Sequence, residues 1–459
     1  MRRVEPQGAA RRRQPHAGRG GGAHRPDAEP RLGGRGAHAR ARAGAALHVV
    51  ELPQQGPHGE RPRAAARSRV GLPRDEGHAH GLPRAGARAE LGETLRPHSA
   101  RRGVRALTSA AQSAERAIDA LRRGHPVQVT DGAAAIAVLA IELADPESLA
   151  AFEGEARANV LLTDKRAAFL GLGNQLAAAG MQAVLVERAP WLDLDTARAV
   201  ADPVLDLATP MKGPFRSLPP GRIERAGRAA LSLAKHAGLL PALFVIEGSA
   251  ADDVVAAADI ERFAETGALK LVSRARLPIK AHEKTEIAAF RLPGGPEHLA
   301  LLIGDPYAAT PLVRLHSSCL TGDLLGSLKC DCGDQLHAAL DAIAASGGGI
   351  LLYLQQEGRG IGLINKLRAY ALQDQGFDTV DANLRLGFEI DEREFALAAN
   401  MLKALGFARV RLLTNNPAKV AGLEAEGISV AERLPLKAGE GAHNEAYLRT
   451  KRDRTGHML

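Results

Sequence analysis

The three cysteines of this chain, Cys319, Cys330 and Cys332, lie within fourteen residues in a C-x10-C-x-C pattern. Zinc binds thiolates readily, and a catalytic zinc typically has three protein ligands and leaves its fourth position to water. Disulfide pairing would leave one cysteine over, and nothing marks the chain as secreted. Three cysteines and no fourth therefore predict an open, catalytic zinc site rather than a closed structural one. Three unrelated buried thiols are the alternative.

Polar and turn-forming residues surround the cysteines, namely His316, Asp323, Asp331 and Gly333. His316 could act as a fourth ligand. We favour a different role for it, as a polar contact beside the metal.

Residues 1–107 differ in composition from the rest of the chain. They are rich in Arg, Gly, Pro, Ala and His, and they contain no Phe, Tyr, Trp, Ile, Asn or Lys. Too little large apolar surface is available to offset the entropy of ordering, so we expect a disordered Arg/Gly/Pro-rich segment. An Arg-rich arm that binds RNA or a membrane is the functional alternative, but no aromatic residues are interleaved for base stacking.

The missing residue types in this segment are those with AT-rich codons, as expected for GC-rich DNA translated in a wrong frame. We therefore hypothesise a misplaced start, with the true start near residue 105. The intact mass of the native protein tests this, and a mass that includes residues 1–100 would refute it.

The net charge of +8 is unevenly distributed. Residues 1–110 hold 22 Arg, no Lys and 9 acidic residues, so they carry +13 and the remainder carries −5. The folded part is mildly acidic, which argues against a nucleic-acid binder. No apolar run is long enough to span a bilayer, and we expect a cytoplasmic protein.

From about residue 109, helical and strand patterns alternate, which predicts an α/β (α+β) fold with two mixed-sheet domains and flanking helices. We expect the first domain to span 108–285 and to be closed by LKLVSRARLP. The second should span 286–459 and begin with the strand patterns TEIAAFRLP and HLALLIG.

Three segments of the first domain, ERAIDALRRGHPVQVTD, RAGRAALSLAKHAGLLPALFVIE and FAETGALKLVS, resemble 3,4-dihydroxy-2-butanone-4-phosphate synthase over about 109–285. That family has an acidic metal-binding run after its first strand, where this chain has Gly132 followed by three alanines. It also has a Gly-His-Thr-Glu motif, where Gly227 here is followed by Arg-Ala-Ala. Alanine neither binds a metal nor moves a proton. Glu247 alone survives, so we expect a degenerate, inactive domain with a scaffold or dimerisation role.

Two strand-to-helix turns mark the second domain. EGRG (357–360) presents Arg359 before a helix, where free N–H groups favour anions. In TNNPAK, Asn416 suits an N-cap and Pro417 the first helical position, with Thr414 and Lys419 beside them. Two such turns side by side indicate a nucleotide-binding site. A solvated surface lysine is the alternative for Lys419.

The segment FEIDERE places Asp391 and Arg393 two residues apart, so both side chains face the same way if the backbone is extended. An ordinary surface ion pair is the alternative interpretation.

The second domain resembles GTP cyclohydrolase II over about 286–459. The resemblance rests on HSSCLTGDLLGSLKCDCGDQL, QQEGRGIGLINKLRAYALQDQGFDTVDAN, LGFEIDERE, LLTNNPAK and HNEAYLRTKRDRTGH. It implies that Cys319, Cys330 and Cys332 bind zinc, and that Asp391, Arg393 and Tyr370 are catalytic. The GTP contacts that it implies are Arg314, Leu315, His316, Ser317, Ser318, Gln335, Glu357, Gly358, Arg359, Thr379, Thr414 and Lys419. Ser318 stands where the family has Glu, which puts one contact in doubt.

The implied reaction is zinc-dependent hydrolysis of GTP to 2,5-diamino-6-ribosylamino-4(3H)-pyrimidinone 5′-phosphate, formate and pyrophosphate, the first step of riboflavin biosynthesis. One Zn²⁺ per subunit, Mg²⁺ on the GTP phosphates and a homodimer are implied as well. The alternatives are a ring-opening paralogue that releases no formate and a non-catalytic scaffold or regulatory protein. Tyr370 favours the full reaction, because the family associates it with a tyrosine there.

Overall fold

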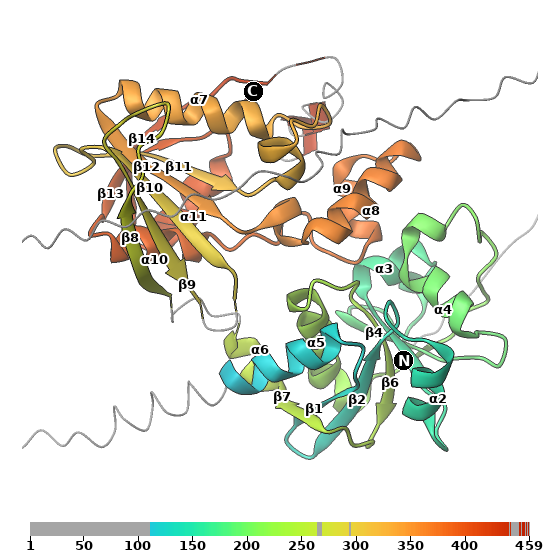
Figure 1. Cartoon of the computed structure of the whole chain (residues 1–459). Coiled ribbons are helices and arrows are strands. Elements are labelled where there is room, and N and C mark those ends of the chain that lie inside the picture. The colour runs from blue at the N-terminus through green and yellow to red at the C-terminus, as the bar shows by residue number, and fades with distance from the viewer. Residues whose placement is uncertain are drawn as a thin grey trace, which may run out of the picture. The chain divides into compact units, whose positions relative to one another are not determined.

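The computed structural model describes residues 111–263, 269–292 and 295–439, together with 441, 449–450, 452–454, 456 and 458. Contacts divide the chain into residues 1–90 and 91–459, and every described residue lies in the second unit. The expectations for residues 1–107 and for most of the motif at 443–457 lie outside the described residues. Within the second unit the described strands form two seven-stranded sheets (Figure 1), which confirms the α/β class with two mixed sheets.

The first sheet has the strand order β5-β4-β3-β6-β2-β1-β7. Neighbouring strands are antiparallel except β1 and β7, which are parallel. Its strands are β1 (Val127–Asp131), β2 (Ala134–Ala140), β3 (Asn159–Thr163), β4 (Ala183–Val186), β5 (Ser217–Leu218), β6 (Ala242–Glu247) and β7 (Asp253–Ala256).

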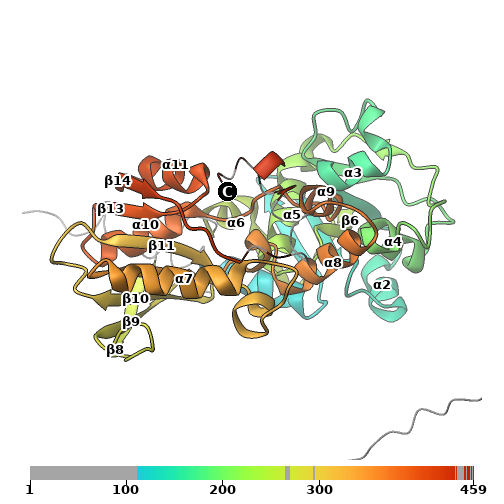
Figure 2. The ribbon, with the colours of Figure 1, turned by 90° about the horizontal axis from the view of Figure 1, so that it is seen from above.

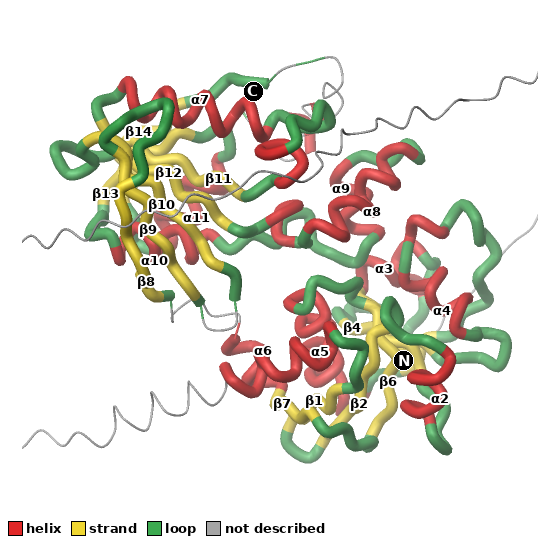
Figure 3. The backbone as a smooth tube through the Cα atoms, viewed as in Figure 1, coloured by secondary structure: helices red, strands yellow, loops and turns green. Residues whose placement is uncertain are grey.

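Helices cover both faces of this sheet (Figure 3). One apolar cluster joins the sheet to the helical residues 111–122, to α5 (Glu224–His236) and to α6 (Ala257–Phe263). A second cluster joins the other face to α2 (Pro146–Glu153), α3 (Asp164–Phe169) and α4 (Leu194–Ala201). Burial on both faces explains why β2 is apolar along its whole length rather than alternating.

The second sheet has the order β14-β13-β11-β12-β10-β9-β8. The pairs among β11, β12, β13 and β14 are parallel, and those among β8, β9, β10 and β12 are antiparallel. Its strands are β8 (Lys270–Arg276), β9 (Thr285–Arg291), β10 (Glu297–Gly304), β11 (Leu312–Ser317), β12 (Gly348–Leu354), β13 (Arg409–Leu413) and β14 (Ser429–Leu434).

Helices also lie on both sides of the second sheet (Figure 2). α7 (Cys332–Ala345) packs on one face, and α10 (Phe395–Ala404) and α11 (Pro417–Ala425) pack on the other. Two further helices, α8 (Leu363–Asp374) and α9 (Thr379–Arg385), contact the first domain through α3 and the short helix η2 (Pro203–Leu205). No described helix is long and apolar enough to cross a membrane.

The three parallel strands β11, β12 and β13 end at one edge of the sheet. The segments that follow them begin at Ser318, Gln355 and Thr414, and these hold the first cysteine, the EGRG turn and the TNNPAK turn. Ligands bind preferentially at the carboxyl ends of parallel strands. This connectivity therefore gathers the predicted motifs at one place.

The segment LKLVSRARLP belongs to the second sheet, not to the end of the first domain as the sequence analysis expected. Lys270–Arg276 forms edge strand β8, which pairs antiparallel with β9 from Lys270↔Arg291 to Arg276↔Glu286. All seven residues of β8 are exposed. Strand pairing depends on residues far away in the sequence. The local pattern therefore predicted a strand but not the sheet to which it belongs.

A substitution at Gly349 tests how tightly the central strands β11 and β12 pack. A Cβ atom added there would lie 2.1 Å from the carbonyl oxygen of Leu312, in the strand paired with β12. We expect Gly349→Ala to destabilise the protein by roughly 1–3 kcal/mol, the usual cost of overpacking, and to lower the thermal unfolding midpoint. Gly173→Ala is the control, because its added Cβ would come no closer than 3.9 Å to another atom. Equal midpoints for the two variants would contradict this account.

Candidate active site

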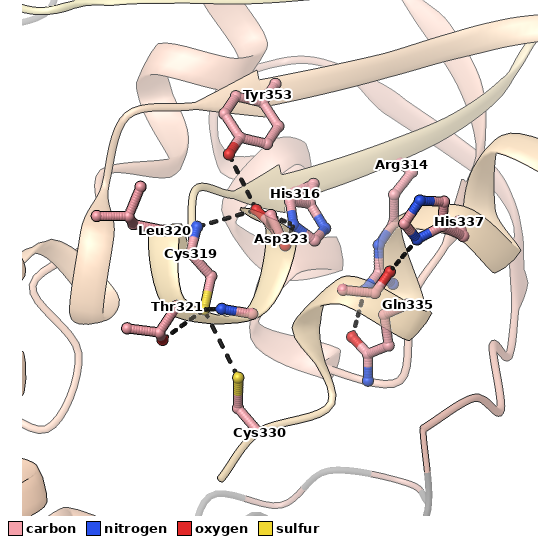
Figure 4. Close-up of polar contacts among 12 residues, drawn as sticks. Arg314, His316, Cys319, Leu320, Thr321, Asp323, Cys330, Gln335, His337 and Tyr353 are labelled. Atoms are coloured by element: carbon pink, nitrogen blue, oxygen red, sulfur yellow. Dashed lines mark hydrogen bonds and ion pairs between the residues drawn. The ribbon is translucent and has the colours of Figure 1, made fainter. Parts of the chain in front are cut away.

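The three cysteine sulfurs converge, and all lie within 4.8 Å of one another. Cys319 precedes the short helix η5 (Leu320–Leu324), Cys330 lies in the following turn, and Cys332 begins α7. The Sγ atoms of Cys319 and Cys330 are 3.6 Å apart (Figure 4). A disulfide would bring them to about 2 Å, whereas two thiolates on one tetrahedral zinc would be about 3.8 Å apart. The donor set therefore fits a metal ion.

A glycine leaves room for this cluster. A Cβ added at Gly322 would lie 2.9 Å from Sγ of Cys330 and 3.0 Å from Sγ of Cys319. Real Cβ atoms rarely come that close to other atoms, so any side chain here would displace the sulfurs. The turn between the cysteines thus depends on a residue without a Cβ.

The carboxylate of Asp323 holds the turn between the cysteines in place. Its carboxylate accepts hydrogen bonds from the backbone N–H of Cys319 at 3.0 Å and from the hydroxyl of Tyr353 at 2.9 Å. Nε2 of His316 lies 3.0 Å from the same carboxylate (Figure 4). A carboxylate only accepts, so this nitrogen carries the hydrogen. Among the described residues only the three cysteines form a group that could hold a metal ion, and His316 instead contacts Asp323.

The ammonium group of Lys366 contacts the cysteine cluster directly. Its Nζ atom donates to Sγ of Cys319 at 3.0 Å, to the hydroxyl of Thr321 at 2.9 Å and to the carboxylate of Glu357 at 2.7 Å. The second oxygen of Glu357 accepts from the N–H of Leu320 at 2.7 Å. A buried ammonium group in this place stabilises negative charge on sulfur.

Tyr370 lies one helical turn after Lys366, and its hydroxyl is 3.3 Å from that of Thr321. Burial raises the pKa of Tyr370 to about 12. The phenol is therefore neutral at physiological pH and can donate a hydrogen bond. Sequence reasoning missed Lys366, although its spacing of four residues from Tyr370 on one helix was a usable signal.

A cavity opens over the cysteines. The predicted site residues, apart from Asp391, line it together: Arg314, Leu315, His316, Ser317, Ser318, Cys319, Cys330, Cys332, Gln335, Glu357, Gly358, Arg359, Tyr370, Thr379, Arg393, Thr414 and Lys419. Further lining residues were not predicted as site residues: Lys329, Ile361, Lys366, Ala369, Gln373, Asn383, Asn415 and Asn416.

Two buried polar atoms in the cavity lining have no hydrogen-bond partner in the described part of the chain. They are the Oγ of Ser318 and the Nε of Arg314. The other nitrogens of Arg314 donate to the carbonyl of Leu413 at 3.0 Å and to the side chain of Gln335 at 2.7 Å. Burial lowers the pKa of Arg314 to about 10, which leaves it charged at neutral pH. Unpaired buried polar groups are costly, and a bound ligand would satisfy them.

The EGRG turn holds a strained residue. Arg359 has φ 64° and ψ 32°, and it is the one non-glycine with positive φ in the described ranges. Such strain clusters at functional sites. The N-cap of α8, Gly362, makes no side-chain capping bond, so the first N–H groups of the helix are not satisfied by a cap. A cation and a helix N-terminus thus occupy one turn, as expected for an anion site.

The TNNPAK turn adopts the predicted cap. Asn416 accepts from the N–H of Ala418 at 2.9 Å, and Pro417 is the first residue of α11. Lys419 is only 7% exposed, and its Nζ atom donates to the carbonyl of Leu315 at 2.7 Å. The alternative of a solvated surface lysine is therefore wrong.

Asp391 and Arg393 form a forked ion pair. Nε and Nη2 of Arg393 lie 2.8 and 2.5 Å from the two carboxylate oxygens of Asp391. The Arg393 side chain is 10% exposed and that of Asp391 30%. Burial opposes ionisation, but hydrogen bonds from Arg393 keep the pKa of Asp391 below its usual value. The pair is partly buried at the cavity rather than an ordinary surface pair.

Replacing Gly322 tests the metal site directly. We expect Gly322→Ala to lower the affinity for the metal by roughly ten- to hundredfold, the range found when groups supporting metal ligands are altered. Competition with a coloured chelator measures this, with Gly173→Ala as the control. Wild-type affinity in Gly322→Ala would show that the sulfurs do not converge as described.

Comparisons with known proteins agree with this geometry. The family model of GTP cyclohydrolase II matches residues 270–435. A GTP cyclohydrolase-2 of Azospirillum brasilense is 46% identical over 373 residues, which cover 76% of this chain and 95% of that protein. A GTP cyclohydrolase-2 of Escherichia coli is 56% identical over 192 residues, 42% of this chain and 98% of that one.

A riboflavin biosynthesis protein RibBA of Phocaeicola vulgatus is 41% identical over 291 residues, 58% of this chain and 72% of that protein. Its match is longer than the 192 residues shared with the E. coli protein, so it extends beyond the second domain. The 46% identity over 95% of the Azospirillum brasilense protein identifies the family. This chain belongs to the GTP cyclohydrolase II family.

Proposed function

We propose that this protein hydrolyses GTP to 2,5-diamino-6-ribosylamino-4(3H)-pyrimidinone 5′-phosphate, formate and pyrophosphate, the first step of riboflavin biosynthesis. The convergence of the three cysteine sulfurs at a cavity lined by buried cations carries the proposal. Soft ligands suit a zinc ion, and the cations suit a triphosphate.

Cys319, Cys330 and Cys332 would hold one Zn²⁺ per subunit. Zinc in such a site supplies Lewis acidity and an activated water for hydrolysis. The hydrogen bonds from Cys330 and Cys332, with further ones from Lys366 and Thr321, hold the pKa of Cys319 well below its usual value. A thiolate is the form that binds metal.

The cationic side of the cavity would hold the triphosphate, together with Mg²⁺ bound to its oxygens. Arg314 in strand β11, Arg359 in the EGRG turn and Lys419 at the start of α11 all line this cavity. Ser318 and Gln335 offer smaller polar groups beside Arg314. Cations from three different segments fix the position of the phosphates as well as attracting them.

Tyr370 would donate a hydrogen bond near the purine ring, because its raised pKa keeps the phenol protonated. For Arg393 we propose an electrostatic role at the phosphates rather than nucleophilic attack. Its guanidinium donates two hydrogen bonds to Asp391, an arrangement that stabilises the charged form. Asp391 would then orient Arg393.

The first domain would not catalyse the reaction of the synthase family that its sequence resembles. Two acids beside the changed motifs are in ion pairs: Glu247 with Arg222 at 2.6 Å, and Asp131 with Arg225 at 2.8 Å. Neither carboxylate is left as an unengaged base. The alanines at 133–135 supply no replacement.

We further propose a cytoplasmic homodimer. Large apolar side chains are exposed in the turn between the cysteines and on α8, and a second copy of the chain would cover them: Leu320, Leu324, Leu325, Ile364 and Leu367. Exposed apolar side chains that gather on one surface mark interaction sites. The molar mass in solution tests this, and a monomer at micromolar concentration would exclude it.

The reaction proposal is tested with GTP and two product assays. We expect the wild-type protein to release formate and pyrophosphate in equal amounts. Cys330→Ser should lose both zinc and formate release, because it removes one of three ligands, while slow pyrophosphate release could persist.

Wild-type protein stripped by a chelator is the matched control. It should behave like Cys330→Ser but recover when zinc is restored, whereas the variant should not. Formate release by a zinc-free variant would contradict the proposal. Ring opening without formate would identify the paralogue reaction, and no turnover at all would favour the non-catalytic alternative.

A further inference from the structure

Several active-site residues lie on α8, on α9 and in the segment 386–394. These parts of the second domain pack against the first domain. Tyr370 lies on α8, Thr379 begins α9, and Asp391 and Arg393 lie in the segment that follows. We propose that the first domain is a support that positions this part of the GTP site. This inference rests on the proposed function, because its readout is GTP turnover.

A continuous apolar cluster joins the two parts. It contains residues of the first domain such as Leu240 and Phe244 together with Leu372 of α8, Ala382 of α9 and Phe388. Each of these five side chains is at most 1% exposed. Domains joined by a well-packed apolar interface do not move freely.

Arg368 connects α8 to two acids of the first domain. Its guanidinium donates to Glu142 at 2.9 Å and to Asp202 at 3.0 Å. These side chains are 12–21% exposed. The remaining nitrogen donates to Asn365, which is fully buried and donates in turn to the carbonyl of Gly238 in the first domain. Arg368 lies two residues before Tyr370, so these bonds fix the rotation of the helix that carries it.

Lys235 of α5 connects the first domain to the catalytic ion pair. Its Nζ atom is bonded to the carboxylate of Glu392, which lies between Asp391 and Arg393 in the chain. The backbone N–H of Glu392 also donates to the carbonyl of Arg359 at 3.0 Å. One bond from the first domain thus holds a residue joined to both the EGRG turn and the Asp391–Arg393 pair.

Gly387 shows how closely this segment approaches the first domain. A Cβ added there would lie 2.8 Å from Oγ1 of Thr163 and 3.0 Å from Cγ of Pro241. Nearby, Arg385 of α9 lies 3.6 Å from Asp206, which also pairs with Arg166 of the first domain. Close backbone approach, ion pairs and the apolar cluster all occur along one surface. A domain that lacks the synthase motifs can therefore still serve turnover.

Lys235→Met tests this support, because it removes the charge on the first domain without touching the cavity lining. We expect kcat/KM for GTP to fall by roughly ten- to hundredfold, the effect of displacing a catalytic group by about 1 Å. Metal content should stay at the wild-type level. Lys235→Arg, which keeps the charge, should restore most of the activity.

The matched control is Arg222→Met. It removes an exposed ion pair with Glu247 inside the same domain, and we expect wild-type kcat/KM. Hydrogen exchange in the folded variants gives a second readout, in which residues 386–394 should exchange faster in Lys235→Met than in Arg222→Met. Unchanged kcat/KM and unchanged exchange in Lys235→Met would overturn the inference. Failure of the proposed function itself would show differently, as wild-type protein that releases no formate.

Discussion

The mutual approach of the three cysteine sulfurs is the constraint on which the rest of the site depends. Thiolates at a sulfur–sulfur distance of 3.6 Å would repel each other strongly unless cations offset their charge. The protein supplies one cation in Lys366, and a metal ion in the cluster would supply the larger one. Asp323 and Glu357 then hold the backbone on either side of Cys319 by accepting hydrogen bonds from the N–H groups of Cys319 and Leu320.

The fold serves this constraint through its connectivity. Parallel strands β11, β12 and β13 deliver the first cysteine, the EGRG turn and the TNNPAK turn to one edge of the sheet. The cations come from strand β11 (Arg314), the EGRG turn (Arg359) and the TNNPAK segment (Lys419), and the sheet core keeps these segments at fixed spacing. The helices α8 and α9 add Tyr370 and Thr379 to the cavity lining, and they pack against the first domain. The candidate site thus lies in the second domain, while α8 and α9 pack against the first domain.

Much of this arrangement could be predicted from the sequence. The cysteine spacing, the N-cap at Asn416 and the turn at Arg359 are local signals, and the structure gathers them in one cavity. Non-local features could not be predicted. Lys366 looks like a surface lysine on an amphipathic helix, and its burial depends on Cys319 and Glu357, far away in the sequence. The pairing of β8 with β9 and the bond between Lys235 and Glu392 likewise depend on how distant segments meet.

X-ray absorption at the zinc edge of the purified protein tests the central claim most directly. The account predicts three sulfur ligands at about 2.3 Å and one nitrogen or oxygen ligand at about 2.0 Å. A site with four sulfurs would require cysteines from two chains and would close the position that substrate chemistry needs. A zinc ion without sulfur ligands, or no bound metal after reconstitution, would contradict the account.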